Sequence, residues 1–256
     1  MKNKLRWIPA IIAVLVIVLG YSSPVYAANP IPGINIDIGG TDANTPAGAA
    51  STVNILLLLT ILSIAPSILV LMTSFTRIVI VLGFVRTSLG TQQMPPNQVL
   101  IGLALFLTFF IMAPTLGEIN QTAYQPYMKG EISQTAALDK ASVTIKKFMF
   151  QHTREKDLKL FLDYTKAAPP TGVEDTPLTA LVPAYAISEL KTAFQMGFMI
   201  FIPFLVIDMV VASTLMAMGM MMLPPVMISL PFKILLFILV DGWYLVVRSL
   251  LLSFNT

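Results

Sequence analysis

Long runs of apolar residues alternate with shorter polar stretches along most of the chain. Four of these runs hold few or no charged side chains and cover residues 53–75, 87–117, 196–222 and 226–252. About 20 apolar residues suffice for a helix to cross the hydrocarbon core of a bilayer, so each run is long enough to span a membrane. We therefore predict an all-α integral membrane protein with two helical hairpins, residues 53–117 and 192–256.

A polar insertion, residues 118–191, separates the two predicted hairpins and carries most of the charged side chains. Within it, apolar side chains recur at the spacing of one helical face. This stripe consists of Leu138, Ala141, Ile145, Phe148, Met149, His152, Leu158, Phe161 and Leu162. We predict one or two amphipathic helices here, interrupted by the Pro- and Gly-containing stretch 167–177. His152 is interpreted as a histidine at the edge of a core, with a proton relay as the alternative.

The N-terminus has the pattern of a secretory signal peptide. Residues 1–7 hold three basic side chains and no acid, an apolar run follows to residue 20, and Val25-Tyr26-Ala27 ends a short polar stretch. This order predicts a signal peptide over residues 1–27, cleaved after Ala27. The alternative is an uncleaved membrane helix, but an apolar run from 8 to 20 rises only about 20 Å as a helix. Residues 28–52 are predicted to be a flexible extracytoplasmic arm.

The signal peptide also predicts the orientation of the chain. A mature N-terminus outside the cytoplasm places the loop after the first apolar segment inside it. Arg77 and Arg86 would then lie beside that cytoplasmic loop, where the positive-inside rule favours basic residues. The polar insertion, residues 118–191, would be extracytoplasmic.

Composition supports a membrane protein and excludes several other classes. Of the residues, 56% are hydrophobic and 11% are charged, whereas soluble domains have about 25% charged residues. Cysteine is absent and there is one histidine, which argues against disulfides, a metal centre or a bound cofactor. The net charge of +3 comes from Lys2, Lys4 and Arg6 in the signal peptide, so no basic face for nucleic acid is indicated.

A predicted helix break joins the third and fourth apolar segments. Gly219 weakens the helix, and Pro224 and Pro225 lack backbone donors, so the chain must break near residues 219–225. The methionines that decorate the break are Met218, Met220, Met221 and Met222. A ring of such loops would form a deformable apolar constriction that gates a pore; the alternative is that methionine only fills irregular gaps. Pro66 and Pro203 are predicted to break or kink their own helices.

Charged residues near the apolar segments form the second candidate site. Asp208 and Lys233 are equally far from the predicted break, so in an antiparallel hairpin they would lie at one depth and form an ion pair that fixes its register. The alternative is proton binding at Asp208 in an ion-coupled transporter. The other charges that we expect to be buried or at a helix end are Arg77, Glu189, Lys191 and Asp241. Glu189 and Lys191 are two positions apart and do not face each other on a helix.

Several of these strings resemble the FliP family of flagellar protein-export gate subunits. They include Thr76-Arg77-Ile-Val-Ile-Val81, the Pro95-Pro-Asn-Gln-Val99 turn, and Phe201-Ile-Pro-Phe-Leu-Val-Ile-Asp208. Met218-Gly-Met-Met-Met222 with its two prolines, and Leu230-Pro-Phe-Lys233, complete the match. The likeness extends over residues 50–256 and is looser in the polar insertion.

This resemblance implies a type III secretion export gate in the bacterial cytoplasmic membrane, at the flagellar basal body. Several copies would assemble with two sister membrane subunits, of the FliQ and FliR families, into a closed pore for unfolded flagellar proteins. The methionine-rich loop would seal that pore. Injectisome export-gate subunits share the pattern and remain an alternative, as does a purely structural assembly subunit. Since the chain shows no nucleotide-binding or catalytic motif, we expect no enzymatic activity.

Overall fold

The structure, a computed structural model, describes the backbone of residues 46–91, 93–165, 170, 172–220 and 222–255. The chain divides into two compact units, Met1–Ile61 and Leu62–Thr256. The described part of the first unit is the beginning of one helix, and the following paragraphs concern the second unit. The predicted signal peptide and most of the predicted arm lie outside the described residues.

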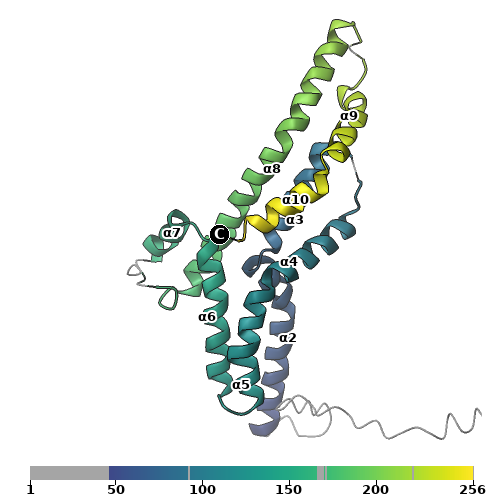
Figure 1. The fold of residues 1–256 in the computed structure, drawn as a ribbon. Helices are drawn as coiled ribbons and strands as arrows, with labels where there is room; N and C mark the ends of the chain where they lie inside the picture. The colour runs from purple at the N-terminus through teal and green to yellow at the C-terminus, as the bar shows by residue number, and fades with distance from the viewer. Residues whose placement is uncertain (1–45, 92, 166–169, 171, 221, 256) are drawn as a thin grey trace, which may run out of the picture. The chain divides into compact units, whose positions relative to one another are not determined.

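All regular secondary structure in the described residues is helical, which confirms the all-α prediction (Figure 1). The helices are α2 (Pro46–Met72), α3 (Phe75–Leu89), α4 (Asn97–Ile119), α5 (Gln125–Met128), α6 (Gln134–His152), α7 (Glu155–Thr165), α8 (Leu178–Ala217), α9 (Pro225–Leu239) and α10 (Gly242–Leu252). A single π-helical turn, Asn120–Tyr124, joins α4 to α5.

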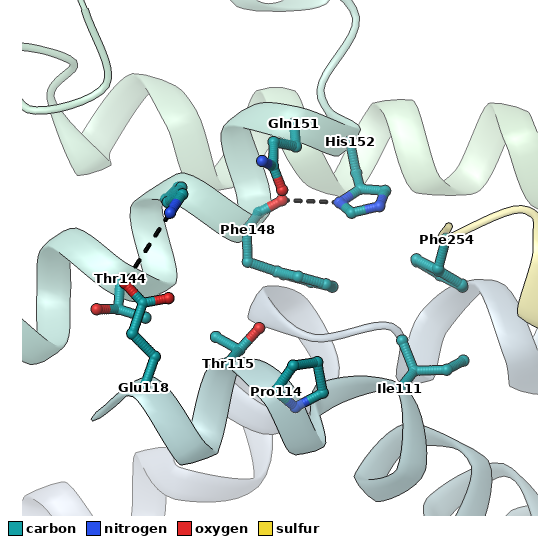
Figure 2. A pocket seen from close by; sticks show the side chains of 10 residues that line it. Ile111, Pro114, Thr115, Glu118, Thr144, Phe148, Gln151, His152 and Phe254 are labelled. Atoms are coloured by element: carbon teal, nitrogen blue, oxygen red, sulfur yellow. Dashed lines mark hydrogen bonds and ion pairs between the residues drawn. The ribbon is translucent and has the colours of Figure 1, made fainter. Parts of the chain in front are cut away.

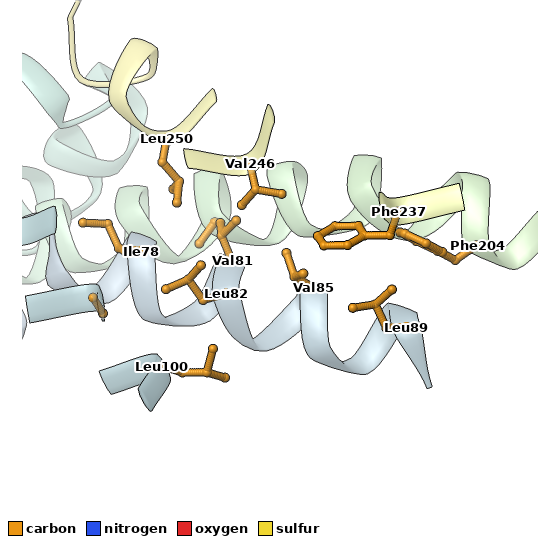
Figure 3. Packing of buried hydrophobic residues seen from close by; sticks show 12 residues of the cluster. Ile78, Val81, Leu82, Val85, Leu89, Leu100, Phe204, Phe237, Val246 and Leu250 are labelled. Atoms are coloured by element: carbon orange, nitrogen blue, oxygen red, sulfur yellow. The ribbon is translucent and has the colours of Figure 1, made fainter. Parts of the chain in front are cut away.

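Helix α3 lies at the centre of the main hydrophobic core. Its buried Val81 and Leu82 pack against α8, α4 and α10. In Figure 3, Val246 and Leu250 of α10 point toward α3 from one side, and Leu100 of α4 lies on the other. A helix that is covered on several sides must be apolar around most of its circumference, which the sequence of α3 is.

The polar insertion forms a second core with the first turns of α8. Met149 of α6 and Leu158 and Leu162 of α7 are buried against Leu181 and Tyr185 of α8. These are positions of the predicted amphipathic stripe, and the one or two amphipathic helices predicted for the insertion are found as two, α6 and α7. The charged side chains of both helices lie mainly outside this core.

Two helices among the described residues are long and apolar enough to cross a membrane, Asn97–Met128 and Leu178–Ala217. Two further pairs pass the same test only as bent spans, so the number of candidate spans is between two and four. One of these pairs is α9 with α10, which meet at an angle of 63°. The prediction of four separate spanning segments is therefore met only in part.

Pro66 and Pro203 are predicted to break or kink their helices, and neither of them ends its helix. Pro66 lies inside α2 and Pro203 inside α8, and both helices continue through them. A lone proline removes one backbone hydrogen bond, which an apolar helix can tolerate when the freed backbone group is satisfied locally. By contrast, Pro224 and Pro225 stand before and at the first residue of α9, so the break predicted there is confirmed.

Candidate functional site

The methionine-rich loop forms the tip of the α8–α9 hairpin (Figure 1). Helix α8 ends at Ala217, Gly219 takes a left-handed conformation with φ of 74°, and α9 begins at Pro225. A left-handed residue just after a helix end is a conformation that glycine adopts without a steric penalty. The sequence therefore ends the helix at the point where the methionines begin.

The methionine side chains of this loop are exposed on the single chain. Met222 is 98% exposed, Met218 is 60% exposed, and Met220 is also exposed. Met221 lies outside the described residues. Gap-filling methionines would be buried in the core of the chain, so that interpretation does not apply to these three.

A polar cluster ties the two helices of this hairpin together below the tip. Lys233 Nζ lies 2.6 Å from Asp208 Oδ2, and Ser229 Oγ donates to Asp208 Oδ1 at 2.5 Å. Lys233 is 3% exposed and also donates to the carbonyl oxygen of Ser88 in α3, at 3.2 Å. The predicted ion pair is thus present in the structure, and Asp208 already has a cation beside it.

A second buried ion pair lies where α3, α8 and the C-terminal segment meet. Arg77 Nε and Nη2 donate to the two carboxylate oxygens of Glu189, at 2.8 and 2.5 Å. Arg77 is 3% exposed and Glu189 is fully buried. Arg77 Nη1 also donates to the carbonyl and hydroxyl oxygens of Ser253, and the guanidinium carbon lies 3.8 Å from the ring centre of Phe254. Planar, two-pronged pairing of this kind suits arginine.

This second pair corrects the membrane arrangement expected from sequence. That arrangement places Arg77 at the cytoplasmic end of the first span and Glu189 at the extracytoplasmic end of the third. The two residues would then be separated by an apolar layer about 30 Å thick. In the structure they are in direct contact, so Arg77 and Glu189 lie at one level, and α3 runs beside the first half of α8.

The residue beside Glu189 connects α8 to the polar insertion. Ser188 Oγ donates to Asp157 Oδ2 at 2.7 Å and accepts from the backbone N–H of Arg154 at 3.0 Å. Asp157 also accepts from Arg154 Nη2, at 2.5 Å. Burial raises the pKa of Asp157, but the hydrogen bonds from Ser188 and Arg154 and the charges of Arg154 and Lys191 outweigh it and hold the pKa below its ordinary value.

His152 borders a cavity of about 270 Å³ between α4, α6 and the C-terminal segment (Figure 2). Its Nδ1 lies 2.8 Å from the carbonyl oxygen of Phe148, and its ring is 5.2 Å from that of Phe254. The half-buried position and these ring contacts match the interpretation of a histidine at the edge of a core. Among the described residues, no group hydrogen-bonds to its buried Nε2.

Two of the predicted buried charges are exposed on the single chain. Lys191 projects from α8 into an exposed position, and Asp241 is exposed in the break between α9 and α10. Asp241 takes a left-handed φ of 51°, the one positive value at a residue other than glycine in the described chain. Both were expected to be buried because their neighbours in sequence are apolar, but each lies on a helix face or turn that points away from the core.

Sequence reasoning missed the partners of Arg77. Glu189, Ser253 and Phe254 are far from it in sequence, and no spacing rule connects them. The available signal for this pair was Glu189 itself, an acid at the start of an apolar stretch, because a charge in such a place requires a partner.

These observations define a helical membrane protein whose longest hairpin carries an exposed methionine loop and is held by buried ion pairs. The sequence profile of the FliP family matches residues 58–250, most of the chain. The chain belongs to the FliP family.

Individual relatives show the same similarity. The flagellar biosynthetic protein FliP of Bacillus subtilis is 70% identical over 83% of this chain and 96% of its own length. That of Cereibacter sphaeroides is 53% identical over 79% of this chain and 67% of its own length. The one from Caulobacter vibrioides is 49% identical over 96% of this chain and 91% of its own length.

Proposed function

We propose that this chain is a pore-forming subunit of the flagellar type III secretion export gate, and that its methionine loop seals the resting pore. The observation that carries the proposal is the exposure of Met218, Met220 and Met222 at a break in the longest apolar hairpin. Large apolar side chains at the tip of a hairpin require a partner surface, and in a ring of identical subunits these loops would meet one another.

Methionine suits such a seal for a physical reason. A narrow apolar constriction excludes water, and so blocks ions without a rigid plug. The methionine side chain is unbranched, has three rotatable bonds and a polarisable sulfur, and can repack around chains of different shapes. The seal could therefore open for an unfolded polypeptide and close behind it.

Assembly with other subunits is supported by the apolar faces that the single chain leaves uncovered. Phe198 and Met199 of α8, Phe106 and Phe110 of α4, and Ile238 of α9 are all exposed. Large apolar side chains exposed in such number mark contact with lipid or protein. We propose that these apolar faces are covered by other copies of this chain, by sister subunits of the FliQ and FliR families, and by membrane lipid. Unfolded flagellar proteins then pass through the pore.

The proposed location is the bacterial cytoplasmic membrane at the flagellar basal body, with the polar insertion outside the cytoplasm. The contact between Arg77 and Glu189 then places α3 at the same level as the base of that insertion. We propose that the chain conducts proteins but catalyses no reaction, so the energy for export comes from elsewhere. Because Asp208 is paired with Lys233, the alternative of a proton-coupled transporter built on Asp208 has less support.

The test replaces Met218, Met220 and Met222 with alanine together in a flagellated bacterium. We expect membranes with the assembled gate to become permeable to small ions while export of flagellar proteins continues, since only the seal is lost. The matched control is Met199→Ala, an exposed methionine of α8 outside the loop. Ion conductance equal to that of the control would refute the sealing role.

A further inference from the structure

The α8–α9 hairpin has a weak point in each of its two helices, and both lie at nearly one depth. Asp208 faces Lys233, and the rings of Phe204 and Phe237 lie 6.3 Å apart, which sets the antiparallel register. The same register places Pro203 within one helical turn of the break at Val240 and Asp241. A proline removes a helical hydrogen bond in one helix where the other helix ends.

The break between α9 and α10 has the geometry of a hinge. The two helices meet at 63°, and Asp241 absorbs the change of direction in a left-handed conformation. Gly242 lies against the ring of Phe237, where an added Cβ would come within 2.2 Å of a ring carbon. A few residues that absorb a large change in backbone angle are what hinges consist of.

Above these two points, the hairpin is tied into one unit. The carboxylate of Asp208 holds both Lys233 and Ser229 of α9, so α9 cannot slide along α8 without breaking an ion pair and a hydrogen bond. The parts of α8 and α9 within residues 204–239 are therefore tied to each other as one arm, which carries the methionine loop at its tip.

Below these two points, the structure is anchored. Arg77 binds Glu189 of α8 and Ser253 after α10, and Leu250 of α10 is completely buried against α3. These contacts fix the base of α8 and the C-terminal end of α10 to α3. The ends of the arm are thus attached to a rigid base.

The arm packs against the C-terminal half of α3, where its Phe204 and Phe237 share a buried cluster with Leu89 (Figure 3). Lys233 donates to the carbonyl oxygen of Ser88, and an added Cβ at Gly90 would lie 3.5 Å from Val226 Cγ1. Val226 belongs to the first turn of α9, close to the methionine loop. Movement of the arm away from α3 has to separate these residues.

We propose that residues 204–239 pivot as a rigid arm on Pro203 and Val240–Gly242, and that this movement carries the methionine loop away from the pore axis. The inference rests on the proposed gate function, because the pivot is the movement that opens the seal. It assigns to Pro203 of α8 and to the left-handed Asp241 a role that packing alone does not explain.

The absence of cysteine in the chain allows a direct test with an engineered disulfide. An added Cβ at Gly90 would lie 3.5 Å from Val226 Cγ1, a position that the sulfur of a cysteine at 226 can take, so Gly90→Cys with Val226→Cys can join the arm to α3. The left-handed φ of 74° at Gly90 makes any side chain there strained, and the single variant Gly90→Cys measures that strain. Secretion of flagellar proteins is measured in cells that carry the double variant, with and without oxidant. We expect loss of export on oxidation, to the level of a strain without the protein, and recovery on reduction.

The single variants Gly90→Cys and Val226→Cys are the controls, since neither can form the staple and both should export under oxidant. Normal export by fully cross-linked cells would overturn the pivot. Failure of the cross-link to form would contradict the contact between the arm and α3.

A second measurement compares two prolines of α8. Pro203→Ala restores a backbone donor at the pivot, whereas Pro183→Ala does so within the anchored base. We expect export to fall for Pro203→Ala and to remain normal for Pro183→Ala; equal export by the two variants would overturn the role of Pro203.

The methionine test separates this inference from the proposed function. If the methionine variants conduct ions and the disulfide does not block export, the pivot is refuted and the proposed seal stands. If the disulfide blocks export but the methionine variants conduct no more ions than the control, the methionine seal is refuted and the moving arm stands.

Discussion

Removal of Glu189 is the most informative perturbation of the contact between α3 and α8, because it leaves the buried guanidinium of Arg77 without its anion. Arg77 is 3% exposed, and both of its bonds to Glu189 are lost in Glu189→Ala. Breaking a buried ion pair by removing one partner costs about 3–5 kcal/mol. We expect the lower part of this range, since Arg77 keeps its bonds to Ser253 and its contact with Phe254.

This loss is large relative to the stability of a typical domain, about 5–15 kcal/mol. Glu189→Gln keeps one acceptor oxygen but loses the charge, so its cost should be smaller, about 1.5–3 kcal/mol, the value of a hydrogen bond to a charged group. Arg77→Met with Glu189→Leu removes both charges, and we expect its stability to equal or exceed that of the natural chain, because no buried charge is left unpaired.

The assay is denaturant unfolding of the purified chain in mild detergent, followed by far-ultraviolet circular dichroism and by the fluorescence of Trp243 in α10. The matched control is Glu118→Ala, whose partner Lys147 is 4.0 Å away with both side chains about half exposed; exposed pairs contribute about 0–1 kcal/mol. Equal unfolding free energies for Glu189→Ala and the control would refute the reasoning, as would a double variant as unstable as the single one.

Three further predictions concern other contacts. Asp208→Ala should abolish export because it strands Lys233, and exchanging the two residues should restore part of it; full export by Asp208→Ala would contradict the pairing role. Gly197→Ala should lower the unfolding free energy by about 1–3 kcal/mol through overpacking, since the added Cβ would lie 2.4 Å from a ring atom of Phe84. If this clash is the cause, the same substitution should cost less in a chain that also carries Phe84→Ala. The pKa of Asp157 is lowered in the folded chain, so its carboxylate stabilises the fold at pH values above the ordinary pKa of 3.8. This contribution should fade as the pH falls below 3.8. In thermal unfolding, Asp157→Asn should therefore differ most from the natural chain at neutral pH.

The two buried ion pairs show where sequence reasoning succeeds and where it stops. Asp208 and Lys233 are 25 residues apart in one hairpin, and the Gly/Pro break between them fixes the register, so their pairing follows from counting along the chain. Arg77 and Glu189 are 112 residues apart. Their contact depends on how α3 packs against α8, which no local pattern encodes.

The prolines illustrate the same limit at the level of one residue. Pro224 and Pro225 lack backbone donors and follow Gly219 by five and six residues, and this local chemistry ends the helix although methionine and leucine between them favour it. Pro203 removes a single backbone hydrogen bond, and α8 continues through it although Pro203, Ile202 and Leu205 are exposed. Two adjacent prolines after a glycine thus end a helix, whereas one proline that removes a single hydrogen bond is accommodated within it.

Buried charges are costly in an apolar chain, so their presence requires an explanation beyond stability. Apolar helices surrounded by lipid gain little from choosing one apolar partner over another, because lipid tails are as apolar as leucine. A directional contact such as Lys233 with Asp208, or Arg77 with Glu189, admits only one alignment of the helices it joins. If this is their role, replacing both members of a pair with apolar residues should keep the helices folded but allow several registers. Cysteines placed along α8 and α9 of an Asp208→Leu, Lys233→Met chain should then cross-link in more than one pairing, and a single pairing would show that packing alone sets the alignment.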